Sequence, residues 1–326
     1  MEKYRILITT YPFGKCGNKP LQLLEQSGHE IVNNPLNRRL KTSEVHALIK
    51  DFDIIIAGTE NYPVEALENS RVKAICRVGI GLDNVPLNYC LEKGVTVTYT
   101  PDAPSQGVAE LTVANILNLS RYILQSDRSV REDAWNRYLG FLLEEMTIGV
   151  VGLGRIGAKV VKLLQPFNTR ILATEIADKT EFAKSQGIEL VDKRTLFQQS
   201  DLVTLHIPSN KDTFQYVNRE VLSWMKTGSY LINTSRGPVV DEAALYDAIV
   251  QDHLNGAALD VFNTEPYEGN LLTLNNVIFT AHMGASAHKS RYLMELGAAE
   301  DCLNYINHQP LFNDALTPEN LISSIF

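Results

Sequence analysis

The sequence predicts an α/β protein with two doubly wound, Rossmann-like or flavodoxin-like parallel sheets, and three observations support this prediction. Short apolar runs alternate with amphipathic stretches along the chain, which is typical of buried parallel strands joined by helices. The turn-rich segment 101–104 interrupts this pattern, which then starts again. A length of 326 residues is enough for a packed core in each of two domains.

The part of the chain before the turn-rich segment has the pattern of a small α/β domain. Apolar, β-branched runs predict strands at 5–10, 29–32, 53–58, 72–78 and 95–100. Amphipathic stretches between these runs predict helices, for example at 20–28 and 43–50. We therefore expect a first parallel sheet before residue 101.

A long helix is expected next, beginning near Ser105. Val108, Leu111, Ala114 and Leu117 recur every three residues and form one apolar face. The strand pattern then restarts, with runs at 147–154, 170–175, 201–208, 229–235, 256–262 and 276–282. Six strands with a glycine-rich turn after the first are typical of a doubly wound nucleotide-binding sheet. A last helical pattern covers 289–307.

Composition and charge argue against several classes of protein. The formal net charge is −8, whereas proteins that bind nucleic acid usually carry a basic excess. The mean hydropathy is −0.10, and no apolar run approaches the roughly 18–20 residues of a membrane span. The N-terminus lacks the long apolar core of a signal peptide. We therefore expect a cytoplasmic protein that binds neither nucleic acid nor membrane.

The cysteines give no sign of a metal site or of a disulfide framework. Cys16, Cys76, Cys90 and Cys302 are scattered along the chain, and no two of them form a Cys-x-x-Cys pair. We therefore expect free thiols in a reducing compartment, and no bound metal.

The stretch Gly149-Val-Val-Gly-Leu-Gly-Arg-Ile-Gly157 carries the most specific signal for a ligand. It follows one predicted strand and opens a predicted helix, and an acid, Glu175, ends the next strand. In this pattern Gly152 permits the tight turn, Gly154 lets the backbone approach a pyrophosphate, and Gly157 lets helix and strand pack closely. The N-terminus of the helix adds free N–H groups and a partial positive charge.

Glu175 predicts which dinucleotide binds. Its carboxylate would accept hydrogen bonds from the ribose hydroxyls and would repel a 2′-phosphate, so we expect NAD rather than NADP. Lys179 is close enough in the sequence to leave NADP open. A glycine turn that serves packing alone is the other alternative.

Three residues at successive strand ends suit one reaction. Arg236 follows the fourth of the six strands, Glu265 the fifth and His282 the sixth. The carboxyl ends of parallel strands meet at one edge of a sheet, where ligands of doubly wound sheets bind. Arg236 could hold a substrate carboxylate and polarise the neighbouring carbonyl as a forked donor. His282 could exchange a proton, while Glu265 would favour the charged imidazole and fix its orientation.

Several motifs resemble those of the D-isomer-specific 2-hydroxyacid dehydrogenases. They are CRVGIGLDNV (76–85), VGLGRIG (151–157), DLVTLHIP (201–208), INTSRGPVVDEAAL (232–245), GAALDVFNTEP (256–266) and TAHMGA (280–285). They follow the family's order over nearly the whole chain. The stretches PVEALENSRVKAICRVGIGLDNV and PDAPSQGVAELTVANIL most resemble the branch of D-3-phosphoglycerate dehydrogenases and hydroxypyruvate reductases.

The resemblance implies a role for each matching residue. Arg236 orients the substrate, Glu265 supports the catalytic histidine, and His282 exchanges the proton. The backbone N–H groups of Val78 and Gly79 meet the substrate carboxylate. The residues implied to bind NAD are Gly152, Gly154, Arg155, Ile156, Gly157, Glu175, His206, Pro208, Thr213, Thr234, Ser235, Asp260 and Gly284, with Asp260 near the nicotinamide.

The resemblance also implies how the domains are arranged. Residues 1–100 and 286–326 form a discontinuous substrate-binding domain, and an NAD-binding Rossmann domain, 101–285, is inserted into it. The family commonly pairs through its nucleotide domains, so we expect a homodimer that uses the long helix and the segment 135–145. Because the chain ends at Phe326, we expect no C-terminal regulatory domain.

The implied function is the NAD-dependent interconversion of a D-2-hydroxy acid and its 2-keto acid, most similar to that of D-3-phosphoglycerate dehydrogenase. Two residues depart from the family pattern. Ala281 stands where the family usually has proline, and Glu60 stands where phosphoglycerate-selective members often carry arginine. Glu60 leaves a glyoxylate or hydroxypyruvate reductase open as an alternative. A non-catalytic, NAD-sensing partner protein is the other.

Overall fold

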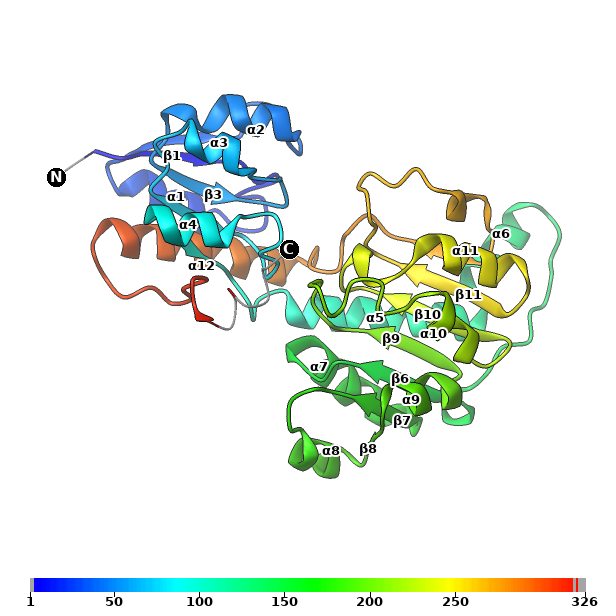
Figure 1. Ribbon diagram of the computed structural model, residues 1–326. Helices are drawn as coiled ribbons and strands as arrows, with labels where there is room; N and C mark the ends of the chain where they lie inside the picture. The colour runs from blue at the N-terminus through cyan, green and yellow to red at the C-terminus, as the bar shows by residue number, and fades with distance from the viewer. Residues whose placement is uncertain (1–2, 319–320, 322–326) are drawn as a thin grey trace. The chain divides into compact units, whose positions relative to one another are not determined.

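The computed structural model describes residues 3–318 and 321, and the chain divides into two compact units (Figure 1). The first unit contains the residues up to Pro104 and those from Ala285 onward, and the second contains Ser105–Gly284. The second unit is therefore one continuous segment, whereas two segments of the chain build the first. Each unit contains its own parallel sheet.

The sheet of the first unit has the strand order β2-β1-β3-β4-β5, and every neighbouring pair is parallel. Its strands are β1 (Arg5–Ile8), β2 (Glu30–Asn33), β3 (Ile54–Ala57), β4 (Ala74–Arg77) and β5 (Thr96–Thr98). All residues of β3 and β4 are buried, because helices cover both faces of the sheet. This is the order of flavodoxin-like doubly wound sheets.

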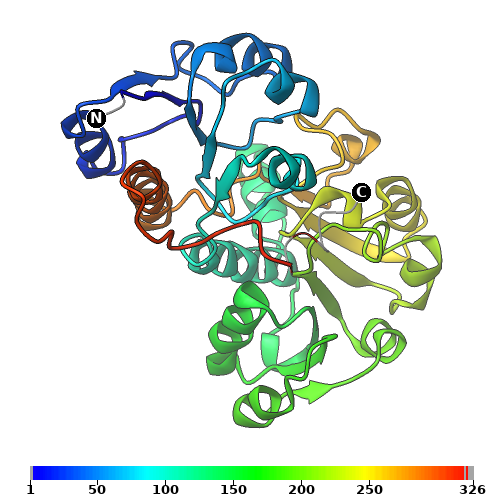
Figure 2. The ribbon, with the colours of Figure 1, turned by 60° about the vertical axis from the view of Figure 1, so that its left-hand side comes forward.

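The helices of this unit are α1 (Lys19–Gln26), α2 (Thr42–Leu48), α3 (Val64–Glu68), α4 (Leu87–Lys93) and α12 (His288–Ile306), with the short 3₁₀ helix η1 (Ile49–Asp51). Helices α1 and α12 lie side by side (Figure 2). They share an apolar core with Ile6 and Ile8 of β1. Leu7 faces the other side, toward α2, α3 and α4, because successive strand residues point to opposite faces. The core of the first unit thus joins both of its chain segments.

The sheet of the second unit has the order β12-β11-β10-β9-β6-β7-β8, again with parallel neighbours throughout. Its strands are β6 (Thr147–Val151), β7 (Arg170–Thr174), β8 (Glu189–Leu190), β9 (Leu202–Leu205), β10 (Ser229–Asn233), β11 (Leu254–Leu259) and β12 (Val277–Phe279). The strand order reverses between β6 and β9, as it does in dinucleotide-binding sheets.

The helices of the second unit are α5 (Ser105–Arg121), α6 (Ile123–Arg131), α7 (Arg155–Leu164), α8 (Thr180–Gln186), α9 (Lys193–Gln199), α10 (Arg219–Trp224) and α11 (Glu242–Val250). The short 3₁₀ helices are η2 (Leu143–Glu145), η3 (Gln165–Phe167), η4 (Gly237–Val239) and η5 (Asn270–Thr273). Helices α5, α7 and α8 share the core on one face of the sheet, and α9, α10 and α11 share the core on the other.

One detail of the second unit differs from the sequence-based prediction, and a second adds to it. Six strands were predicted, but the sheet has a seventh, β8, at its edge. Glu189 and Leu190 are both exposed, so this strand lacks the buried apolar run by which the others are recognised. The predicted long helix ends at Arg121, because Tyr122 adopts a left-handed conformation with φ of 53°, and α6 begins at the next residue.

Candidate active site

The glycine-rich stretch forms the turn between β6 and α7. Gly152 has φ of +91°, which L side chains rarely adopt, and a Cβ there would lie 2.7 Å from the carbonyl oxygen of His206. A Cβ on Gly157 would overlap the carbonyl oxygen of Gly152. Both positions therefore require glycine for the turn itself and for the packing of helix on strand.

Gly154 leaves the outer side of this turn open. It is the N-cap residue of α7, and a Cβ built on it would meet no atom within 4 Å. The first N–H groups of a helix have no partner within it, so the turn offers donors and partial positive charge next to open space. Arg155 is exposed, while Ile156 packs against the core beneath the helix. These features fit a bound pyrophosphate.

Glu175 follows β7, and hydrogen bonds fix its carboxylate beside the glycine turn. Oε2 accepts from the N–H of Leu153 at 2.6 Å, and Oε1 accepts from the N–H groups of Ile176 at 2.8 Å and Ala177 at 3.2 Å. A negative charge is therefore held at the end of the strand next to the turn. This is the position that the sequence predicts for the acid that binds the ribose.

His206 follows β9, at the point where the strand order reverses. Its backbone N–H donates to the carbonyl oxygen of Val151 at 2.8 Å, and Nε2 of its ring lies 3.1 Å from Oγ1 of Thr204. Burial lowers the pKa of His206 to about 3, so the ring is neutral at ordinary pH. Among the described residues, its buried Nδ1 has no hydrogen-bond partner.

The loop after His206 contains two more of the predicted cofactor-binding residues. Pro208 is exposed, and its carbonyl oxygen accepts from Oγ1 of Thr213 at 2.7 Å. The N–H of Asn210 in turn donates to Oγ1 of Thr213 at 2.8 Å. Thr213 therefore closes this loop upon itself at the carboxyl edge of the sheet.

The turn after β10 carries Arg236. Thr234 is buried, and its hydroxyl lies 2.9 Å from that of Thr112 in α5. Asn233, the last residue of β10, is 1% exposed and bonds to the two residues beyond Thr234. Its Oδ1 accepts from the N–H of Ser235 at 3.0 Å, and its Nδ2 donates to the carbonyl oxygen of Arg236 at 2.8 Å. The guanidinium Nη1 donates to the carbonyl oxygen of Ser235 at 2.7 Å.

Glu265 and His282 form a hydrogen-bonded pair. They follow β11 and β12, which are neighbours in the sheet. Nδ1 of His282 lies 3.0 Å from Oε2 and 3.1 Å from Oε1 of Glu265. The His282 side chain is 36% exposed, and that of Glu265 is 19% exposed. The carboxylate thus orients the imidazole, which remains accessible from solvent.

Asp260 anchors the loop that carries His282. Its carboxylate is almost fully buried and accepts three hydrogen bonds, from Oγ1 of Thr280 at 2.5 Å and from the N–H groups of Met283 and Gly284 at 2.8 Å. Its backbone carbonyl accepts from the N–H of His282 at 2.8 Å. His282 has φ of 51°, a left-handed conformation that is uncommon for residues other than glycine and that persists only where its surroundings impose it.

Val78 and Gly79 lie in the first unit, directly after β4. The N–H of Val78 donates to the carbonyl oxygen of Ala57 at 2.8 Å, because the pairing of β4 with β3 continues for one residue. The N–H of Gly79 donates to Oγ1 of Thr100 at 2.8 Å. Both groups already have protein acceptors, so a substrate carboxylate can bind them only by sharing or exchanging these bonds.

The described residues hold no group of three or more His, Cys, Asp or Glu side chains that could bind a metal ion. Across residues 3–318 and 321, no helix has both the length and the apolar character needed to cross a membrane. The cysteines Cys16, Cys76, Cys90 and Cys302 are free thiols, and the last three are buried.

Comparison with known proteins assigns the family. Residues 113–284 match the model of the D-isomer specific 2-hydroxyacid dehydrogenase, NAD binding domain. D-3-phosphoglycerate dehydrogenase of Methanocaldococcus jannaschii is 38% identical over 277 residues, which are 83% of this chain and 52% of that protein. The chain belongs to the D-isomer specific 2-hydroxyacid dehydrogenase family.

Two further proteins match the chain over nearly their whole length. Hydroxypyruvate reductase of Thermotoga maritima is 35% identical over 301 residues, which are 89% of this chain and 94% of that protein. D-lactate dehydrogenase of Aquifex aeolicus, solved in complex with NAD and lactic acid, superimposes with a TM-score of 0.84 at 27% identity, covering 96% of this chain and 99% of that chain.

Length distinguishes these relatives. The chain spans about half the length of the D-3-phosphoglycerate dehydrogenases that it matches. NAD is the cofactor of the family's NAD binding domain, and the open glycine turn of the second unit, with Glu175 beside it, has the geometry that this cofactor needs.

Sequence reasoning overlooked two features of the site that the structure shows. Asn233 was not singled out, although it is a buried carboxamide three residues before Arg236. For Asp260, which the sequence predicts near the nicotinamide, sequence reasoning did not find the support that its carboxylate gives to the loop around His282. An asparagine or aspartate at the carboxyl end of a buried strand is the signal that marks both, since such residues must find partners in the following turn.

Proposed function

We propose that the chain is an NAD-dependent oxidoreductase that interconverts a D-2-hydroxy acid and its 2-keto acid. The observation that carries this proposal is the pairing of His282 with Glu265, at 3.0 Å, at neighbouring strand ends of the sheet that also carries the glycine turn and Arg236. An imidazole held by a carboxylate is suited to exchange a proton near neutral pH. A nearby guanidinium is suited to bind a carboxylate.

The residues of the glycine turn would hold the cofactor. Gly152, Gly154 and the first N–H groups of α7 would bind the pyrophosphate, and Glu175 would accept from the adenosine ribose. The loops that contain His206, Pro208, Thr213, Thr234, Ser235 and Gly284 would line the rest of the site. When bound, NAD supplies the acceptor or donor of a hydride. Because Glu175 is anionic, we propose NAD rather than NADP.

The three catalytic residues would act as follows in the reductive direction. Arg236 would form a bidentate contact with the substrate carboxylate and draw electron density from the neighbouring carbonyl. His282 would donate its proton to the carbonyl oxygen from Nε2, because Nδ1 is bound to Glu265. Glu265 would favour the imidazolium form that donates this proton.

The first unit would be the substrate-binding domain, with the second unit as the NAD-binding domain inserted in it. Within the first unit, the N–H groups of Val78 and Gly79 would share their hydrogen bonds with the substrate carboxylate. A carboxylate is a stronger acceptor than the carbonyl of Ala57 or the hydroxyl of Thr100, which supports such an exchange.

Two substrate classes follow from the relatives and from one residue. Identity to D-3-phosphoglycerate dehydrogenases supports a phosphorylated acid. Glu60 supports the second class, small unphosphorylated acids such as hydroxypyruvate or glyoxylate. It follows β3, is 3% exposed, and its Oε2 accepts from the N–H of Gly58 at 2.8 Å. A buried carboxylate at the carboxyl edge of this sheet would repel a phosphate.

We also propose that the protein is a homodimer through its second unit. Residues 135–142 fold back along α5 and α6, since the N–H of Phe141 donates to the carbonyl oxygen of Ser120 and Tyr138 stacks on Tyr122. Trp135 is 71% and Leu139 93% exposed, and the apolar side chains of Ile123, Leu124, Val130, Tyr138, Phe141 and Leu142 are exposed around them.

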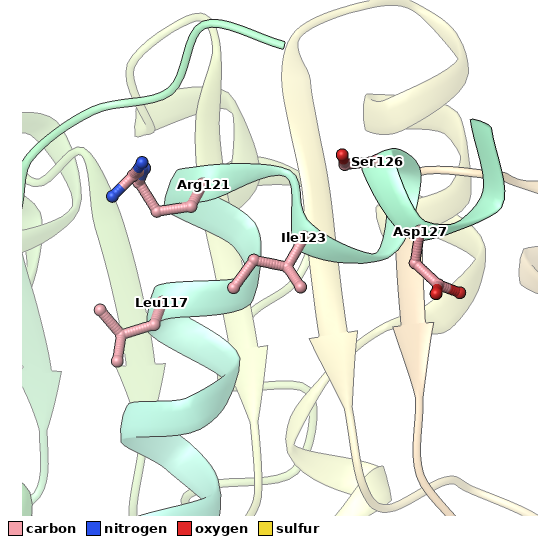
Figure 3. A pocket seen from close by; sticks show the side chains of 5 residues that line it. All are labelled: Leu117, Arg121, Ile123, Ser126 and Asp127. Atoms are coloured by element: carbon pink, nitrogen blue, oxygen red, sulfur yellow. The ribbon is translucent and has the colours of Figure 1, made fainter. Parts of the chain in front are cut away.

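The adjoining surface of α5 and α6 is hollowed, which supports the same contact. Leu117 and Arg121 of α5 and Ile123, Ser126 and Asp127 of α6 line this pocket (Figure 3). Large exposed apolar side chains that gather in one region mark interaction surfaces, and a second copy of the chain is the simplest partner for this one. The free cysteines support a cytoplasmic location, which cell fractionation would test.

The experiment that tests the proposed activity is a substrate panel. Oxidation of NADH would be followed with glyoxylate, hydroxypyruvate, 3-phosphohydroxypyruvate and pyruvate, each against a His282→Ala control. We expect turnover with at least one of these acids. In the His282→Ala control the rate should be about 10²–10⁴-fold lower, because general acid catalysis contributes that much. Binding of NADH without turnover on any acid would instead support the non-catalytic alternative.

A further inference from the structure

The reaction proposed above requires that Arg236 present its guanidinium in one direction, and the structure shows which residue holds it. Arg236 lies in the turn between β10 and η4, where its carbonyl oxygen accepts from the N–H of Val239 at 3.3 Å. Asn233 is the last residue of β10 and is 1% exposed. A buried carboxamide must have hydrogen-bond partners, and those of Asn233 all lie in this turn.

The carboxamide of Asn233 uses its acceptor and its donor on different residues. Oδ1 accepts from the N–H of Ser235 at 3.0 Å and from its hydroxyl at 2.8 Å. Nδ2 donates to the carbonyl oxygen of Arg236 at 2.8 Å. The carbonyl oxygen of Ser235 accepts from Nη1 of Arg236 at 2.7 Å. Asn233 therefore fixes both the backbone of Arg236 and the residue against which its guanidinium rests.

The turn has little freedom to move in other ways. A Cβ on Gly237 would overlap the backbone of Phe262, so the turn packs directly on the chain that leads to Glu265. The carbonyl oxygen of Asn233 accepts from the N–H of Asp260 at 2.9 Å. Asn233 thus connects the turn of Arg236 to the strand end that supports His282.

From this arrangement we infer that Asn233 is a positioning residue, which sets the direction of the Arg236 guanidinium without touching the substrate. Only a carboxamide serves this purpose, since the site needs one acceptor and one donor in a fixed plane. An aspartate has the same shape but no donor, and its second oxygen would face the carbonyl oxygen of Arg236. The turn would then open at Arg236 while Ser235 stays bonded.

Asn233→Asp tests this inference because a positioning role should change KM for the 2-keto acid and leave the binding of NADH unchanged. We expect kcat/KM for the 2-keto acid to fall about 10- to 100-fold, mainly through a higher KM, because small displacements of a positioning group cost that much. The Kd for NADH and the pH profile should stay as in the wild type, because the glycine turn and the Glu265–His282 pair are untouched. Urea unfolding verifies that the variant is folded, and Asn233→Ser replaces it if it is not.

Two controls separate positioning from general loosening of the fold. Asn276→Asp removes a single donor bond, from Nδ2 to the carbonyl oxygen of Asn255 at 2.8 Å. Asn276 directly precedes β12, at the amino end of the strands and away from Arg236, so this variant should leave KM unchanged. In a double-mutant cycle, Asn233→Asp should add no further loss of kcat/KM to an Arg236→Ala variant, because the group that it positions is gone.

The inference is overturned if Asn233→Asp keeps kcat/KM within about twofold of the wild type, or if its loss adds in full to that of Arg236→Ala. The inference can also be tested without measuring enzyme activity. If the wild-type protein reduces no 2-keto acid, the proposed function fails, while a crystal structure of Asn233→Asp still decides this point. Displacement of Arg236 with an otherwise unchanged sheet supports positioning, and an unmoved guanidinium contradicts it.

Discussion

Replacement of His206 should change how the stability of the protein depends on pH. Burial lowers the pKa of His206 to about 3 in the folded chain, whereas an unfolded chain has the ordinary histidine value of about 6.5. Below pH 6.5 the unfolded state therefore binds a proton that the folded state does not, and stability falls as the pH falls. The loss of stability grows as the pH falls to about 3, where the folded chain also binds the proton on His206.

The size of the effect follows from this difference. Each pH unit below about 6.5 costs about 1.4 kcal/mol, so the wild type should lose about 2 kcal/mol between pH 7 and pH 5 through this one group. His206→Gln cannot take up the proton and should lose about 2 kcal/mol less over the same interval. His206 adjoins the glycine turn, because a Cβ built on Gly152 would lie 2.7 Å from its carbonyl oxygen and a Cβ built on Gly157 would lie 3.5 Å from its Cβ.

Urea unfolding at the two pH values, at constant ionic strength, measures this difference. Thr204→Val is the matched control, because it removes the hydroxyl 3.1 Å from Nε2 but leaves the ring able to titrate. It should lower stability at both pH values and keep the loss of about 2 kcal/mol between them. If His206→Gln loses as much stability as the wild type from pH 7 to pH 5, the buried neutral histidine is not the cause.

Two other predictions concern the cofactor and the assembly. Glu175→Ala should lower the ratio of kcat/KM with NADH to kcat/KM with NADPH, because the charge beside the glycine turn is removed. A wild-type enzyme that does not prefer NADH would contradict the role of Glu175. Leu139→Glu places a charge at the most exposed apolar side chain of 135–142 and should convert a dimer into a monomer in light scattering at micromolar concentration. A wild-type protein that is already monomeric there would refute the proposed contact.

The main layers of the fold were predictable because parallel strands that are buried on both faces leave continuous apolar runs. The runs Ile54–Ala57 and Thr147–Val151 are buried along their whole length, so the sequence predicts both strands. The edge strand Glu189–Leu190 was missed because both residues are exposed and only backbone pairing with β7 makes the segment a strand. The apolar pattern also gives no sign that α5 ends at Arg121.

The site was predictable in its parts but not in its supports. Glycine turns and strand-end residues follow from spacing, so Gly152, Glu175 and His282 could be singled out. The partners of Asn233 and Asp260 could not, because they depend on how the turns after β10 and β12 fold back. Likewise, no pattern shows that the N–H of Val78 is already bound to Ala57, since that bond depends on strand register.

The measurement that tests the central claim most directly is the pH profile of reductive kcat/KM for Glu265→Gln. Glutamine keeps the shape of the residue and an acceptor for Nδ1 of His282, but removes a negative charge 3.0 Å from the ring. Opposite charges about 4 Å apart attract by about 1 kcal/mol even in water, and partial burial of Glu265 strengthens this.

We therefore expect the alkaline limb of the profile to move to lower pH, because the proton donor loses its negatively charged partner. Glu242→Gln is the control, since its Oε1 accepts from the N–H of Asn263 at 2.8 Å in the same loop, and its limb should stay in place. An alkaline limb that does not move in Glu265→Gln would show that Glu265 is not coupled to the proton donor, and would contradict the assignment of His282 to that role.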